Sequence, residues 1–208
     1  KRKLYKKLHL RPDSRPFISG DTFRSISDFI YEDELQKFKY HEVGFKQIVF
    51  VASHLLFKFL SEIHPLIKNQ YILISHNGDN NIGEEYEKLI DRKVYKFYCQ
   101  NLLFSGQNIF HIPIGIENKY YFVNGILEHF KPGTEKPSLP KVLTAFNLST
   151  NISVRKECLN VLSSYKNSTI LSNRVSSMDF NNLLRKHMFV ASPEGNGLDC
   201  HRTWEAIY

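Results

Sequence analysis

Short apolar runs alternate with segments of helical spacing along most of this chain, and this alternation limits its fold more than any other feature. The runs are rich in Val, Ile, Phe and Tyr, as buried strands are. In the first part of the chain we predict strands at residues 47–51, 71–75, 94–99 and 108–114. Helical spacing occurs between them at 54–63 and 83–90. Strands that alternate with helices are typical of a parallel sheet, so we predict an α/β fold.

The segment 131–140 divides the predicted elements into two groups. It is rich in Pro and Gly, as linkers are. We therefore predict an N-terminal domain at 1–130, a linker at 131–140 and a C-terminal domain at 141–208. The N-terminal domain is expected to contain a helix at 21–29, with Asp21 as its cap and an apolar stripe that includes Phe29. In the C-terminal domain we predict strands at 141–146, 169–171 and 188–191, and helices at 153–162 and 176–186.

Composition excludes some classes of protein and leaves others open. The net charge of +7 indicates an anionic partner without identifying it. The basic cluster at 1–7 is interpreted as a solvated tail, with contact to a membrane surface or to nucleic acid as alternatives. Three widely spaced cysteines without a Cys-x-x-Cys pair argue against a zinc site or a disulfide framework, and they favour a cytoplasmic location. No apolar run approaches the roughly 20 residues that span a bilayer.

The most informative stretch is the last one, where a predicted strand at 188–191 leads into a loop rich in Pro and Gly. This loop, residues 192–197, precedes a segment of helical spacing that carries His201, Arg202 and Glu205. Glycines let a backbone approach an anion, and free amides at a helix start favour its charge. We predict that the loop binds a phosphate-containing ligand. A tight turn followed by a surface ion pair between Arg202 and Glu205 would explain the same spacing.

Two further loops follow predicted strands and carry polar side chains. The loop after the strand at 141–146 contains Asn147 and Thr150, with Arg155 in the first turn of the next helix. These side chains could bind phosphate or sugar, or they could form an ordinary helix cap beside a solvated Arg155. His76 and Asp79 follow the strand at 71–75, where a general base or a binder of sugar hydroxyls would lie. An Asn-Gly turn capped by Asp79 is the structural alternative.

The segment from Pro193 to Tyr208 resembles the donor-binding motif of exostosin-like glycosyltransferases. Residues 15–24, 74–79 and 112–118 also resemble members of that family, although less specifically. The resemblance implies the GT-B architecture, with two Rossmann-like domains, of which the second is incomplete in this chain. It also implies that Glu205 binds the ribose of a nucleotide-sugar. The chain lacks an Asp-x-Asp motif, and the family typically needs no metal bound by one.

The resemblance and the motifs together predict a nucleotide-sugar-dependent glycosyltransferase that inverts configuration and needs no metal. A UDP- or GDP-sugar would be its co-substrate rather than a cofactor, and a glycan or another hydroxyl compound its acceptor. We expect no nucleic-acid partner, and we expect a cytoplasmic enzyme with peripheral membrane association as one possibility, or a Golgi-lumenal one in a eukaryote. The expected catalytic residues are His76 and Asp79. The expected donor-binding residues are Asn147, Thr150, Arg155, Ser192, Pro193, Glu194, Gly195, Asn196, Gly197, Asp199, His201, Arg202 and Glu205. The alternative is a non-catalytic module that binds glycan or nucleotide within a glycosyltransferase complex.

Overall fold

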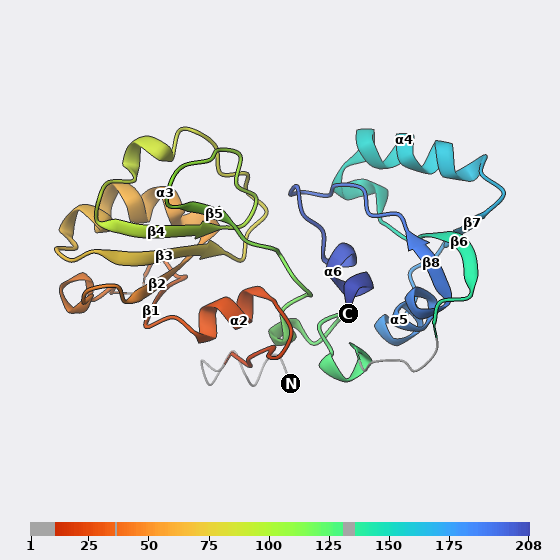
Figure 1. Cartoon of the computed structure of the whole chain (residues 1–208), viewed down its shortest axis with the longest axis horizontal. Helices are drawn as coiled ribbons and strands as arrows, with labels where there is room; N and C mark the ends of the chain where they lie inside the picture. The colour runs from red at the N-terminus through yellow and green to blue at the C-terminus, as the bar shows by residue number, and fades with distance from the viewer. Residues whose placement is uncertain (1–10, 36, 131–135) are drawn as a thin grey trace. The chain divides into compact units, whose positions relative to one another are not determined.

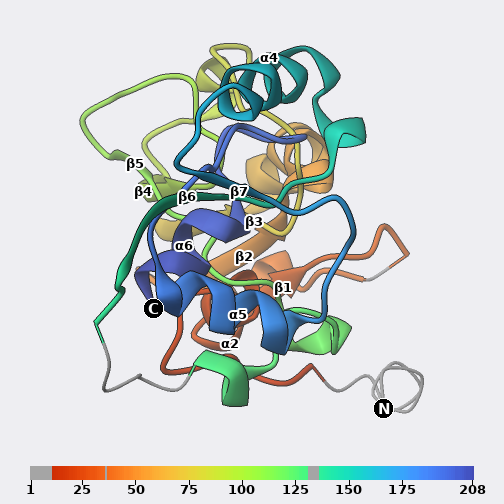
Figure 2. The same cartoon turned by 90° about the vertical axis from the view of Figure 1, so that its right-hand side faces the viewer.

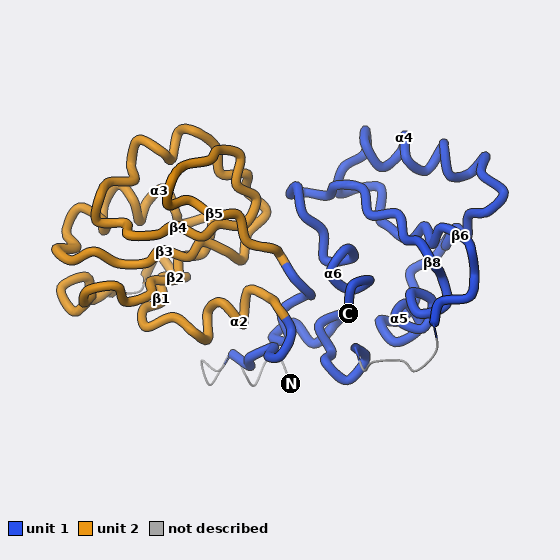
Figure 3. The backbone as a smooth tube through the Cα atoms, in the orientation of Figure 1, with its two compact units in different colours: residues 1–17, 115–208 blue, residues 18–114 orange. Residues whose placement is uncertain are grey.

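The computed structural model describes residues 11–35, 37–130 and 136–208, and it contains two parallel sheets (Figure 1). The chain divides into two compact units, which Figure 3 colours separately. Unit 2 consists of residues 18–114, and unit 1 combines residues 1–17 with 115–208. The division between the units falls near residue 115, and of the predicted linker 131–140 residues 131–135 lie outside the described part. The prediction of an α/β fold is confirmed.

Unit 2 is built on a five-stranded parallel sheet whose strands follow one another in chain order. The strands are β1 (Phe29–Tyr31), β2 (Ile48–Ala52), β3 (Tyr71–His76), β4 (Val94–Cys99) and β5 (Ile109–His111). The predictions at 47–51, 71–75, 94–99 and 108–114 are thus confirmed to within a few residues. Because the order follows the chain, this sheet lacks the reversal of strand order found in a doubly wound fold.

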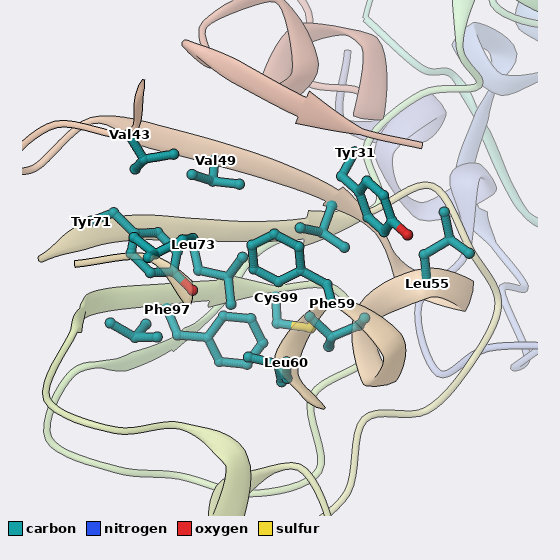
Figure 4. Close-up of a cluster of buried hydrophobic side chains, with 14 of the residues drawn as sticks. Tyr31, Val43, Val49, Leu55, Phe59, Leu60, Tyr71, Leu73, Phe97 and Cys99 are labelled. Atoms are coloured by element: carbon teal, nitrogen blue, oxygen red, sulfur yellow. The ribbon is translucent and has the colours of Figure 1, made fainter. Parts of the chain in front are cut away.

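Helical segments cover the two faces of this sheet. A continuous helical stretch runs through η2 (Ser53–Leu55), α3 (Leu56–Lys58), η3 (Phe59–Ile63) and η4 (His64–Leu66). Its apolar side chains pack on one face against alternate residues of the strands, and they form the main buried core (Figure 4). Phe59, Leu73 and Phe97 are fully buried there, which stabilises the fold by roughly 2–3 kcal/mol for each side chain. The segment at 83–90 forms turns and the short η5 (Glu87–Leu89) instead of the predicted helix.

The helix predicted at 21–29 is shorter than expected. Helix α2 spans Gly20–Ser25, and its cap is Ser19, whose hydroxyl accepts from the amide of Thr22. Asp21 is buried in the first turn and is not the cap. The apolar residues from Phe29 onward belong to β1, which pairs with β2. A run of two or three apolar residues fits the period of a helix as well as that of a strand, so its spacing alone did not distinguish them. Pairing with the buried strand β2 makes this segment a strand.

Unit 1 contains a three-stranded parallel sheet with the order β7-β6-β8. Its strands are β6 (Leu139–Thr144), β7 (Ser168–Ile170) and β8 (His187–Val190), and its helices are α4 (Ile152–Ser163), α5 (Ser177–Lys186) and α6 (His201–Ile207). Figures 1 and 2 show α4 on one side of the sheet and α5 on the other. The first strand in the chain, β6, is the central strand of this sheet. The chain adds β7 on one side of β6 and then crosses over to add β8 on the other side, so the strand order reverses at β6. Open α/β sheets bind ligands at such a reversal, beyond the carboxyl ends of the strands.

No helix in the described part of the chain is long and apolar enough to cross a membrane. Cys99, Cys158 and Cys200 form no disulfide bond in the described part of the chain.

Candidate donor site in unit 1

The loops that follow β6 and β8 are held together by one buried arginine. Arg155, in the first turn of α4, is only 6% exposed. Its Nη1 donates to the carbonyl oxygen of Asn147 at 2.6 Å, in the loop after β6. Its Nε donates to the carbonyl oxygen of Glu194 at 2.8 Å, and Nη2 to that of Pro193 at 3.4 Å, in the loop after β8. Arg155 is therefore neither solvated nor open to a ligand, and it fixes the relative position of the two loops.

Gly195 is needed because Arg155 passes directly beside it. A Cβ atom at this position would lie 2.7 Å from Nη2 of Arg155, closer than real Cβ contacts. The carbonyl oxygen of Gly195 accepts from Nδ2 of Asn151, the residue that caps α4. The amide of Gly195 donates to the carbonyl oxygen of Gly197 at 3.2 Å. This amide, one of those predicted to face a diphosphate, is thus used within the loop itself.

Asn147 and Thr150 form a local turn. The side-chain oxygen of Asn147 accepts from the amide of Ser149, and the hydroxyl of Thr150 donates to the carbonyl oxygen of Asn147. The alternative interpretation, an ordinary helix cap beside a solvated Arg155, is correct for the cap, because Asn151 caps α4. It is wrong for Arg155, which is buried. The loop after β6 is thus held by its own hydrogen bonds, and Asn147 is exposed on its surface.

Arg202 in α6 is the most unusual side chain of the site. Its Nε donates to the carbonyl oxygen of Ala145, just past the end of β6, at 2.8 Å. Its Nη1 is buried and has no hydrogen-bond partner among the described residues. The guanidinium groups of Arg202 and Arg155 both lie near the ring of Phe146, at 5.7 and 5.8 Å from its centroid. Burial, with the nearby charge of Arg155 as the second cause, lowers the pKa of Arg202.

Glu205, one turn after Arg202, is the acidic group of the site. The two side chains do not form the surface ion pair that was the alternative interpretation, because no carboxylate of the described residues lies within 4.0 Å of Arg202. Burial raises the pKa of Glu205 to about 7, against a smaller lowering by Arg202. The carboxylate of Glu117 adds to the rise. Glu117 itself accepts hydrogen bonds from Asn124 and from the amide of Gly125.

The remaining predicted residues of the terminal segment hold α6 in place. Helix α6 begins at His201, so the glycine loop and the helix are separated by several residues. The carboxylate of Asp199 accepts from the indole N–H of Trp204 and from the amide of Cys200. His201 Nδ1 donates to the carbonyl oxygen of Gly115 at 2.7 Å. The hydroxyl of Ser192 contacts that of Thr203 at 2.8 Å.

The two predicted catalytic residues belong to unit 2. His76 ends β3 and is 2% exposed, with the ring of Phe23 5.3 Å away. Its Nδ1 accepts from the amide of Asn77 at 2.7 Å, so Nε2 carries the proton and donates to the carbonyl oxygen of Pro113 at 3.0 Å. Both ring nitrogens are engaged, and a proton transfer by His76 would require one of them to be released. Asp79 is exposed in the following loop.

Phe146 and Glu117 lie outside the predicted set of site residues. Phe146 is the last residue of the predicted strand at 141–146, and its place at the strand end was the available signal. Glu117 belongs to the segment 112–118, which resembles the glycosyltransferase family. Glu117 is far from Glu205 in sequence, and no spacing rule connects them. Among the described residues, no group of three or more His, Cys, Asp or Glu side chains is arranged to hold a metal ion. No model of a known protein family matches the chain, and no curated protein matches it.

Proposed function

We propose that this chain is the sugar-nucleotide-binding part of a glycosyltransferase of GT-B type. The observation that carries the proposal is the buried, unpartnered Nη1 of Arg202 beyond the carboxyl ends of β6 and β8. An unsatisfied N–H of a buried cation costs free energy, which an anionic ligand would recover through a charge-assisted hydrogen bond. The reversal of strand order at the same place supports a ligand site on independent, topological grounds.

In the proposed complex, Arg202 binds the diphosphate of a UDP- or GDP-sugar. Arg155 acts as a positioning residue, because its guanidinium already binds three carbonyl oxygens. As the bond from the anomeric carbon to the diphosphate oxygen breaks, negative charge grows on the leaving group, and Arg202 stabilises it. Glu205 accepts hydrogen bonds from ribose hydroxyls, and cationic neighbours and ligand hydroxyls favour its ionised form there. No metal is assigned a role.

The acceptor hydroxyl needs a base, and Asp79 is the better of the two candidates. Its side chain is exposed, whereas His76 holds the end of β3 through both ring nitrogens. This engagement of His76 is also the observation that favours the second candidate function, a non-catalytic module that binds a sugar nucleotide. Such a module keeps the Arg202 site and needs no base.

Calorimetric titration with UDP, GDP and their sugars tests the proposal. We expect binding that is selective for one nucleotide and weakened at least tenfold by Arg202→Gln, since a charged hydrogen bond contributes about 1.5–3 kcal/mol. Glu157→Gln, an exposed substitution on α4, is the control and should leave binding unchanged. Absence of binding to every nucleotide would refute the donor site. Binding with no hydrolysis or transfer of the sugar would select the non-catalytic module.

A further inference from the structure

The amino-terminal edge of the sheet in unit 2 carries a cluster of basic side chains. The loops before β2, β3 and β4 meet there, because the amino ends of parallel strands share one edge of a sheet. Three hydrogen bonds join the loops: Lys46 amide to Gln70 carbonyl oxygen, Asn69 Nδ2 to Val43 carbonyl oxygen, and Gln70 Nε2 to Arg92 carbonyl oxygen. We call this surface, made of residues 43–47, 66–70 and 91–93, the basic edge.

The charges of the basic edge are mostly unpaired. It contains Lys46, Lys68, Arg92 and Lys93, with Asp91 as its acidic residue. Asp91 lies near Lys93 and the buried His64. Lys46, Lys68 and Arg92 are exposed, and none of them forms an ion pair with a carboxylate of the described residues. Lys96, in β4, likewise forms no ion pair with a described carboxylate, and its ammonium group lies near the rings of Tyr95 and Phe110. Such an edge attracts an extended anionic surface.

Large apolar side chains protrude between these charges. Phe45 is 66% exposed and Leu66 is 49% exposed, and they come from two of the three joined loops. Side chains of this kind beside Lys and Arg are typical of proteins that lie on a bilayer, where the apolar groups enter the headgroup boundary and the cations meet anionic lipids.

The basic edge contains a single aromatic ring, that of Phe45, and the ammonium group of Lys46 lies 5.1 Å from its centroid. The ammonium group of Lys46 lies 4.2 Å from the centroid of the Tyr95 ring, and so covers one of its faces. Single-stranded nucleic acids stack successive bases on several aromatic side chains, and one ring beside a cation does not provide such a series, so the geometry favours a lipid surface.

We propose that the basic edge docks unit 2 on a membrane surface that contains anionic lipids. Lys46, Lys68 and Arg92 bind the headgroups, and Phe45 and Leu66 enter the interface. This surface belongs to the amino ends of the strands in unit 2 and is separate in sequence from the donor site in unit 1. The proposal therefore does not depend on the proposed glycosyltransferase activity.

Vesicle sedimentation tests the proposal, with vesicles of phosphatidylcholine alone or mixed with phosphatidylglycerol. We expect binding to the mixed vesicles that weakens as salt is raised. The triple variant Lys46→Asn, Lys68→Gln, Arg92→Gln should lose on the order of a hundredfold in affinity, because each basic group contributes about 1 kcal/mol. Asn is chosen at residue 46 because its backbone φ is 57°, which Asn tolerates.

Matched controls separate the basic edge from general effects. The variant Lys141→Gln, Lys156→Gln, Lys166→Gln removes the same charge from exposed positions of unit 1 and should bind vesicles normally, apart from a small loss from net charge. Phe45→Ser should weaken binding more than Phe57→Ser, which removes a similarly exposed ring elsewhere in unit 2. All variants leave residues 1–7 intact. Equal binding by the two triple variants would overturn the proposal. Binding to a single-stranded oligonucleotide but not to mixed vesicles would also overturn it, in favour of nucleic acid.

Discussion

Replacing Glu205 by Gln should stabilise unit 1 at alkaline pH. Burial raises the pKa of this carboxyl from 4.5 to about 7, so the folded state holds the proton more tightly than the unfolded chain does. The stability is then greatest below pH 4.5, falls as the pH rises from 4.5 to about 7, and stays low above that range. Gln is neutral at every pH and removes this loss.

The size of the effect follows from the pKa shift. A shift from 4.5 to about 7 corresponds to about 3 kcal/mol at 1.36 kcal/mol per pH unit. Because Glu205 keeps partial contact with solvent, we expect a gain of about 1–2 kcal/mol in the free energy of unfolding at pH 8.5. At pH 4.5 the variant and the parent protein should be nearly equal in stability.

Urea unfolding followed by tryptophan fluorescence measures this difference. Trp204 is the single tryptophan of the chain and lies in α6 one residue before Glu205, so its emission reports on unit 1. Glu157→Gln, an exposed carboxyl on α4, is the control and should change stability little at either pH. A Glu205→Gln variant that is no more stable than the parent at pH 8.5 would show that the carboxylate is well solvated or paired, and the argument would fail. If the gain in stability occurs and sugar-nucleotide binding weakens in the same variant, Glu205 is a residue kept for its ligand at the expense of stability.

Three other substitutions or reactions test the structure. Arg155→Gln should destabilise unit 1 by about 2–4 kcal/mol, because it leaves the carbonyl oxygens of the two site loops without their donor; an unchanged urea midpoint by Trp204 fluorescence would contradict this. Phe59→Ala should lower the unfolding free energy of unit 2 by about 3–5 kcal/mol, measured by circular dichroism, whereas the exposed Phe57→Ala should cost far less. In the native protein Cys99 should resist thiol reagents at pH 8, since burial raises its pKa to about 12, while the partly exposed Cys158 and Cys200 react; mass spectrometry of labelled peptides would reveal any early labelling of Cys99.

Strands β2, β3 and β4 could be predicted because each is a run made mostly of Val, Ile, Leu, Phe and Tyr. Val94–Cys99 was predicted with its observed bounds, because five of its six residues are Val, Tyr, Phe or Cys. Strand β1 was not predicted, and its first residue, Phe29, was included in the helix predicted at 21–29, because so short a strand carries too little pattern to choose between the two periods. Pairing with β2, which lies about twenty residues later in the chain, decided the outcome.

Some features of the candidate site also follow from the sequence, and others depend on the tertiary structure. The sequence by itself determined that a glycine loop and two arginines follow strands of one α/β unit, because strand ends and breakers are local properties of the chain. Only the tertiary structure decided that Arg155 binds backbone and that Arg202 keeps a buried N–H without a partner. The basic edge likewise joins three loops through hydrogen bonds between residues that lie more than twenty positions apart in the chain. Hydrogen bonds and burial depend on which segments meet in space, and no spacing within a single segment carries that information.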